Sequence, residues 1–140
     1  MTMAEAKARL AAAREGRRRL KVLDAKIEHY RDMAAHATGR MDGMRYDASG
    51  PPSALEENVI RLVDLQREAR AERAAYIEHL AWAEEAIRGL ANGQQRSVLE
   101  LRYICGYSWE RIAQTLEMDE RWVRRLHGMA LEKLKNFGLD

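Results

Sequence analysis

An apolar stripe that keeps its register through residues 54–92 is the strongest constraint on how this chain can fold. Its members step by four and three residues, so they lie on one face of a long helix. The stripe consists of Leu55, Val59, Leu62, Gln66, Ala69, Arg73, Tyr76, Leu80, Ala83, Ile87 and Leu90. A lone helix of this length cannot bury such a face against a small domain. We therefore expect it to pack on another helix of the chain, on a second copy, or on both.

The stripe also predicts self-association, with a homodimer as the expected homo-oligomer. Its polar members, Gln66 and Arg73, either fix register and partner number or lie at the edge of a looser helical hairpin. The residues expected to form the oligomer contacts are Val59, Leu62, Ala69, Tyr76, Leu80 and Ile87.

A first long helix is predicted over about Ala4 to His36. Its apolar positions, again spaced by three and four, form a coiled-coil-like seam of Leu20, Leu23, Ile27, Tyr30 and Ala34. A basic stripe on the far side consists of Arg14, Arg17, Arg18 and Lys21. This stripe is either a solvated face or a non-specific contact for phosphates.

Turn-forming residues separate the predicted elements. Residues 37–53 read ATGRMDGMRYDASGPPS, a composition typical of a linker or ordered loop. Ser53 and Glu56 then form a capping box that begins the long helix. Asn92 and Gly93 end that helix as a hinge or C-cap, and the next module begins with Gln94.

Two shorter helices follow in the arrangement of a helix-turn-helix. Apolar residues at i, i+3, i+4 and i+7 predict an amphipathic helix, namely Trp109, Ile112, Ala113 and Leu116. Ser108 is its expected N-cap, and Asp119 is the expected N-cap of the following helix. The connection is only residues 117–119, the length of a turn in a DNA-reading motif. Many such turns place Gly at positive φ, whereas this chain has Glu117, at a cost of about 1 kcal/mol.

The second helix of this pair has one basic and one apolar side. Arg121, Arg124, Arg125 and Gly128 fall within about a third of its circumference. The predicted docking side consists of Trp122, Val123, Leu126 and Ala130. Arginine can contact guanine bidentately or clamp a phosphate. A glycine inside a helix is costly, so Gly128 indicates close approach either of a phosphate backbone or of another helix.

The segment RSVLELRYICGYSWERIAQTLEMDERWVRRLHGMALEKL resembles region 4 of bacterial sigma-70-type factors, the module that reads the −35 promoter element. The resemblance implies that the start of the second helix enters the major groove of double-stranded DNA. Trp122 and Glu120 depart from the family pattern, so the same target sequence is not implied. The predicted DNA-contact residues are Ser108, Arg111, Asp119, Glu120, Arg121, Arg124, Arg125 and Gly128.

The pairing of this module with a helical N-terminal half resembles phage late-gene transcriptional regulators of the ArpU type, in which ERWV and LHGxAL phrases recur. That resemblance implies a phage or prophage source and control of packaging or lysis genes. The sigma resemblance also allows contact with RNA polymerase. Residues 1–90 carry only widely spaced aromatics, so promoter melting by this protein alone is not expected.

Composition sets the fold class and excludes other functions. The chain is 46% hydrophobic, has two prolines and shows no strand-like alternation, which predicts an all-α protein: a long helical N-terminal arm followed by a C-terminal helix-turn-helix. The net charge of +2 is too small to indicate a nucleic-acid partner by itself. The prediction of DNA binding therefore rests on the geometry of the helix-turn-helix. Cys105 stands alone, and the four histidines lack metal-site spacing. We expect no enzyme activity, no metal, no cofactor, no membrane segment, and a cytoplasmic location.

The sequence therefore divides into an N-terminal helix (1–36), a linker (37–53), a long packing or oligomerisation helix (54–92) and a DNA-binding helix-turn-helix domain (93–140). It predicts a sequence-specific DNA-binding transcriptional regulator that is dimerised through its helical arm. Two alternatives stay open. One is a phage DNA-packaging protein of the small terminase type, and the other is a helical protein-interaction module that never binds DNA.

Overall fold

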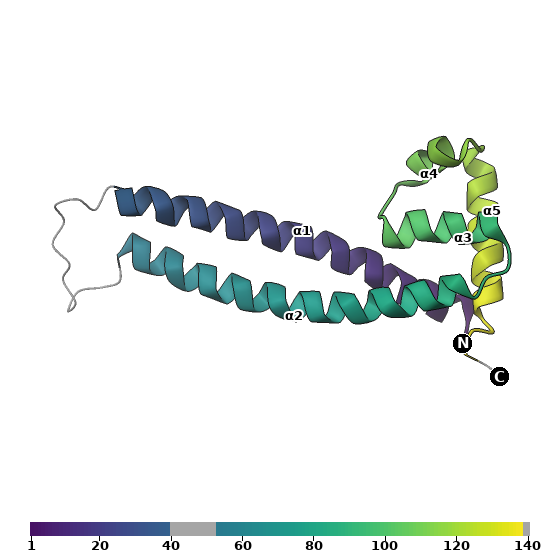
Figure 1. Cartoon of the computed structure of the whole chain (residues 1–140), viewed down its shortest axis with the longest axis horizontal. Helices are drawn as coiled ribbons and strands as arrows, with labels where there is room; N and C mark the ends of the chain where they lie inside the picture. The colour runs from purple at the N-terminus through teal and green to yellow at the C-terminus, as the bar shows by residue number, and fades with distance from the viewer. Residues whose placement is uncertain (40–52, 139–140) are drawn as a thin grey trace. The chain divides into compact units, whose positions relative to one another are not determined.

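The computed structural model describes residues 1–39 and 53–138, which are helical apart from short turns. Its elements are α1 (Met3–Gly39), α2 (Ala54–Arg88), α3 (Gly93–Leu99), the π-helical η1 (Glu100–Ile104), α4 (Trp109–Leu116) and α5 (Glu120–Leu134) (Figure 1). The described residues contain no strand, so the all-α prediction is confirmed. Most of the predicted linker, residues 40–52, lies outside the described residues.

Side-chain caps begin both long helices. Ser53 Oγ accepts a hydrogen bond from the Glu56 amide at 3.2 Å, the serine half of the predicted capping box. A second, reciprocal box begins α1: the Thr2 hydroxyl accepts from the Glu5 amide, and the Glu5 carboxylate accepts from the Thr2 amide, each at 3.0 Å. This box was not predicted, although its Thr-x-x-Glu spacing is in the sequence.

The end of α2 differs from the prediction. The helix stops at Arg88, and Asn92 caps the next helix, its side chain accepting from the Gln95 amide at 3.0 Å. Gly93 is accordingly the first residue of α3. Asparagine satisfies an orphan amide at a helix start as readily as it ends a helix, so its position alone did not distinguish the two roles.

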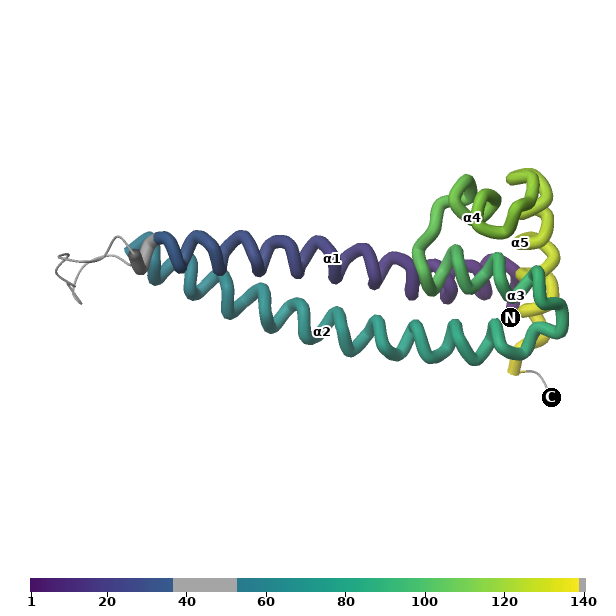
Figure 2. Tube along the Cα trace, turned by 45° about the horizontal axis from the view of Figure 1, so that its top comes forward, coloured from purple at the N-terminus to yellow at the C-terminus, as the bar shows by residue number. Residues whose placement is uncertain are grey.

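Residues 19–73 form one compact unit, here called the hairpin. Within it α1 and α2 lie side by side and antiparallel (Figure 2). Its core consists of four buried residues, Leu23, Ile27, Leu65 and Ala69. Half-buried Tyr30 and Leu62 pack against them. Two members of the predicted stripe, Leu62 and Ala69, therefore pack on the first helix of the same chain. Arg73 lies at the edge of this core, exposed and 3.5 Å from Asp24, as the looser-hairpin interpretation expects.

Residues 1–18 and 74–140 form the second compact unit, here called the module. Its largest apolar cluster takes residues from α1, α2, α3, η1 and α5. The fully buried side chains at its centre include Leu10, Ile87, Leu99 and Leu134. The module is thus a helical bundle in which the first turns of α1 take part, and not the C-terminal helices alone.

The residues predicted to mediate oligomerisation differ in how deeply they are buried within one chain. Ala69 is buried in the hairpin core and Ile87 in the module core, so both already pack within one chain. Leu62, Tyr76 and Leu80 are half-buried. Val59 remains 44% exposed. Among the described helices, none combines the length and apolarity that crossing a membrane requires.

Candidate nucleic-acid interface

The helix pair α4 and α5 is held by an apolar core of its own. Ile112 and Ala113 of α4 pack with Val98 of α3 and with Val123 and Leu126 of α5. The other two members of the predicted α4 stripe, Trp109 and Leu116, are half-buried against the same cluster. The predicted amphipathic helix is therefore confirmed, together with the inward side of Val123, Leu126 and Ala130.

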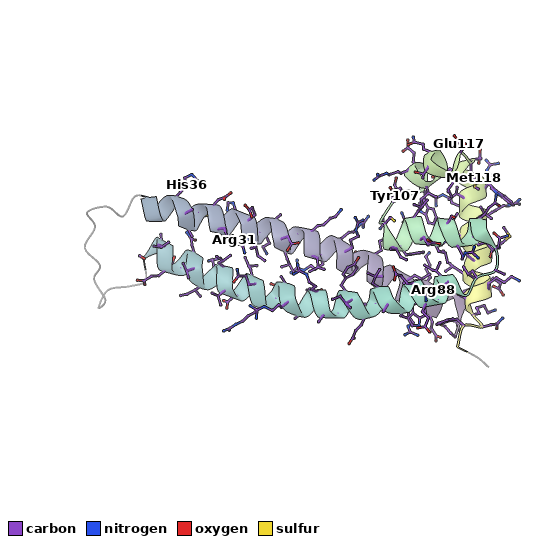
Figure 3. The ribbon with its side chains drawn as sticks, in the orientation of Figure 1. Arg31, His36, Arg88, Tyr107, Glu117 and Met118 are labelled. Atoms are coloured by element: carbon purple, nitrogen blue, oxygen red, sulfur yellow. The ribbon has the colours of Figure 1, made fainter. Side chains whose placement is uncertain are left out.

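A Schellman turn joins the two helices. The Met118 amide donates to the Ala113 carbonyl at 2.9 Å, and the Glu117 amide donates to the Gln114 carbonyl at 3.3 Å. Glu117 has φ 54° and ψ 48°, the left-handed conformation that the sequence predicted for this position. Figure 3 shows Glu117 and Met118 where α4 gives way to α5. This turn fixes the direction in which α5 leaves α4.

Two of the predicted DNA-contact residues are caps. Ser108 Oγ accepts from the Arg111 amide at 3.1 Å and begins α4. The Asp119 carboxylate accepts from the Arg121 amide at 2.8 Å and begins α5. Both predicted capping roles are confirmed, and both side chains are also exposed.

The basic side of α5 faces solvent. Arg121 and Arg125 are exposed, and no ion pair involves either of them among the described residues. Arg124 is 57% exposed and forms an ion pair with Glu120 at 3.3 Å. Its guanidinium carbon also lies 5.1 Å from the centre of the Trp109 ring. The three arginines therefore differ: two are unpaired, and one is held in place.

Arg111, the remaining predicted contact, stacks on an aromatic ring. Its guanidinium carbon lies 3.8 Å from the centre of the Tyr107 ring, a cation–π distance. Tyr107 precedes α4 (Figure 3). This contact holds the arginine at the exposed start of α4.

Trp122 was predicted on the docking side of α5, and this prediction is wrong. The side chain is 41% exposed, because its position falls beside the buried arc that Val123 and Leu126 occupy. Met129, seven residues later on the same flank, is exposed as well. The outward face of α5 thus combines arginines with a strip of apolar surface.

Gly128 is half-buried on α5, one turn beyond exposed Arg124 and Arg125. A Cβ atom built there would meet no atom within 4 Å, so no described helix packs against it. The helix-packing interpretation of this glycine is therefore wrong within the described chain. Approach of an outside molecule remains a prediction.

A buried polar pair lies behind this face. The Tyr103 hydroxyl and His127 Nε2 are 2.6 Å apart, and the neutral imidazole shares one hydrogen bond with the hydroxyl in either tautomer. Burial lowers the pKa of His127 to about 4, and the positive charges of Lys7, Arg102 and Arg124 contribute to that lowering. Burial likewise raises the pKa of Tyr103. The imidazole is thus a neutral structural group at physiological pH.

The N-terminal part of α1 contributes contacts that sequence reasoning missed. Arg17 donates to the Cys105 carbonyl, and half-buried Arg14 lies beside Arg102 and Tyr103. The stripe containing both was predicted to be solvated or to face phosphates, and for these two residues the solvated interpretation is wrong. Gly106 accommodates the approach: it has φ +77°, and a Cβ atom there would lie 2.6 Å from Arg17 Nη1.

A comparison with protein families finds a match for the C-terminal segment. Residues 92–136 match the family model of sigma-70, region 4. They form a sigma-70 region 4-like helix-turn-helix. The match spans α3, η1, α4 and α5, and it indicates that residues 92–136 are a DNA-binding, non-catalytic segment with a regulatory role. No curated protein matches the chain, and no solved structure does.

Proposed function

We propose that this chain is a sequence-specific transcriptional regulator that inserts α5 into the major groove of double-stranded DNA. The observation that carries the proposal is the exposed face of α5, where Arg121 and Arg125 flank the open space at Gly128. The Schellman turn and the caps at Ser108 and Asp119 hold this face at a fixed angle to α4. A preformed helix pair of this kind is what docking in a groove requires.

The three arginines of α5 would make different contacts with DNA. Among the described residues no carboxylate forms an ion pair with Arg121 or Arg125, so each can contact a guanine edge or a phosphate. Arg124 is already held by Glu120 and by the Trp109 ring, which suits it to position a phosphate. The Trp122 and Met129 flank offers apolar contact, for example with thymine methyl groups.

Selection of bound duplexes from a random pool, at a stated salt concentration, tests this proposal. We expect one enriched site, because bidentate arginine contacts discriminate between bases by about 1–3 kcal/mol each. Arg121→Ala or Arg125→Ala should relax the preference at one position of that site. Arg70→Ala, an exposed arginine of the hairpin, is the matched control and should change nothing. Unchanged duplex binding after loss of both Arg121 and Arg125 would contradict the proposal.

Gly128 gives an independent test of how closely DNA approaches. Gly128→Ala should stabilise the folded protein by about 1 kcal/mol, since alanine favours helix and the site is open. The same change should weaken duplex binding if a phosphate passes over this position. Tighter or equal duplex binding by the alanine variant would place the DNA elsewhere.

Self-association is part of the proposal, because one recognition helix makes few contacts and two joined helices bind paired half-sites. Self-association would use apolar side chains that are exposed on the hairpin. These include Val22, Val59, Ile60 and Val63. Ile60→Glu together with Val63→Glu should produce a monomer in sedimentation experiments. A ring in place of a dimer would favour the DNA-packaging alternative.

The source and the partner are also proposed. The ERWV and LHGxAL phrases support a phage or prophage regulator of late genes that acts in the cytoplasm, and the region 4 match supports contact with bacterial RNA polymerase. Transcription in vitro from a template carrying the selected site, with and without this protein, tests both regulation and its direction. An identical transcript yield in both reactions would argue against them.

A further inference from the structure

A cleft of about 600 Å³ opens on the module between the first turns of α1 and the helix-turn-helix. Its walls come from α1, η1, α4 and α5, and all of its residues belong to the one compact unit. The charged residues that line it are Lys7, Arg14, Glu15, Arg102 and Arg124. Four positive charges thus face a single carboxylate.

These cations are poorly neutralised. Within residues 1–39 and 53–138 no ion pair involves Lys7, Arg14 or Arg102, and only Arg124 pairs with a carboxylate, that of Glu120. Burial lowers the pKa of Arg14 and of Arg102, and neighbouring arginines lower both further, while Glu15 offsets this in part for Arg14. The positive charges of the cleft therefore lie close enough to repel one another.

Arg14 supplies a hydrogen-bond donor without an acceptor. Its Nε atom is buried from solvent, and no described residue forms a hydrogen bond with it. An unpaired buried donor is costly, and a charged one more so. An anion in the cleft would satisfy that donor and reduce the repulsion together.

Two other clefts formed by described residues lack this excess of positive charge. A second cleft on the module, of about 370 Å³, is lined by two arginines and two glutamates, namely Arg88, Arg96, Glu84 and Glu100. A cleft on the hairpin likewise mixes Asp24 and Glu28 with its arginines. Among these clefts of the described residues, unbalanced positive charge is thus specific to the one beside α5.

We propose that this cleft binds a phosphate group, held by Arg14 and Lys7 of α1 together with Arg124 of α5. Arginine presents two parallel N–H donors that match phosphate oxygens, and an ammonium adds a point charge. Arg102 is anchored by its hydrogen bond to the Tyr107 carbonyl at 3.1 Å and by stacking on Trp109 at 4.3 Å. It therefore supplies fixed charge at the wall.

Two sources of phosphate share this chemistry. One is the backbone of a duplex bound at α5, since Arg124 belongs both to the cleft and to the predicted interface. The other is a free phosphate-bearing anion. In the first case α1 extends the DNA contact beyond the helix-turn-helix, and only this case rests on the proposed function.

The test titrates the full chain with inorganic phosphate while the Trp109 indole resonance is followed by NMR, and separately measures duplex affinity against salt. Lys7→Ala and Arg14→Gln are the variants, and Lys21→Ala, an exposed lysine on α1 outside the cleft, is the matched control. Removing one charge-assisted contact should weaken binding about tenfold. For the duplex it should also lower the salt slope by about one.

Each result has a meaning. Saturable phosphate binding that both variants weaken, with duplex affinity unchanged, assigns the cleft to a free anion. Loss of duplex affinity and salt slope in both variants, but not in Lys21→Ala, assigns it to the DNA backbone. If neither binding depends on Lys7 and Arg14, the proposal is overturned. Because Lys7 is exposed, its replacement should leave the fold intact, so the Lys7→Ala result reports on binding alone. A chain that binds no duplex refutes the proposed function, and the phosphate titration then decides the cleft alone.

Discussion

The module and the hairpin are both helical, but they bury their side chains to different depths. In the module, side chains from six helical elements pack together, and Leu99, Ile112 and Leu126 are almost fully buried. In the hairpin, two helices share one stripe centred on Leu23 and Leu65. Two helices cover only one face of each other, so apolar residues on the remaining faces stay exposed. The comparison indicates that the module holds its helices at fixed angles, whereas the hairpin leaves apolar side chains exposed.

The largest expected difference between the two units is in the free energy of unfolding that is lost when a core leucine is replaced by alanine. Leu126→Ala in the module should lower the free energy of unfolding by about 2–5 kcal/mol, because its 2% exposure leaves little room for relaxation. Leu62→Ala in the hairpin removes a half-buried side chain and should cost about 1 kcal/mol. Urea unfolding followed by circular dichroism measures both. Equal costs would show that the hairpin is packed as tightly as the module.

The next effect is a pH dependence confined to the module. The pKa of His127 is about 4 in the folded protein and about 6.5 in the unfolded chain, so the unfolded chain binds the proton first as the pH falls. Its contribution to stability is therefore intact above pH 6.5 and is lost progressively down to pH 4, by about 3 kcal/mol in all. Unfolding measured across this range should show the loss in the wild type. The loss should be smaller by that amount in His127→Gln, and parallel profiles would contradict the argument.

A smaller effect is expected at the turn between α4 and α5. Glu117→Gly should raise the free energy of unfolding by about 1 kcal/mol, because glycine adopts positive φ without the steric cost that glutamate bears. Gln114→Gly, on the exposed side of α4, is the control and should lower it by about the same amount. Thermal unfolding of the two variants should shift in opposite directions. Destabilisation by both would mean that Glu117 is not strained.

The smallest effect is expected from the ion pairs of the hairpin. Arg19 and Glu68 are 2.5 Å apart, but both side chains are more than two-fifths exposed, 41% and 44%. A double-mutant cycle with Arg19→Ala and Glu68→Ala should give a coupling free energy of about 0.2–1 kcal/mol that declines with added salt. A larger, salt-insensitive coupling would make electrostatics, rather than Leu23 and its neighbours, the main stabiliser of the hairpin.

The sequence by itself determined the local structure around the helix-turn-helix. The caps at Ser108 and Asp119, the left-handed Glu117 and the inward side of α4 were predictable, because each depends on residues within a few positions along the chain. The exposed arginines of α5 follow from the same helical periodicity.

Only the tertiary structure decided what the long helices pack against. Spacing shows which face of a helix is apolar but not which face it meets, so Ile87 was assigned to a second copy although it is buried in the module. The buried residues of the first turns of α1 are Ala6, Leu10 and Ala13, and two of the three are alanines, whose small side chains give a weak apolar signal. The packing of this part of α1 in the module was therefore not predicted. Contacts between residues far apart in the chain depend on shape and volume, which a one-dimensional pattern does not record.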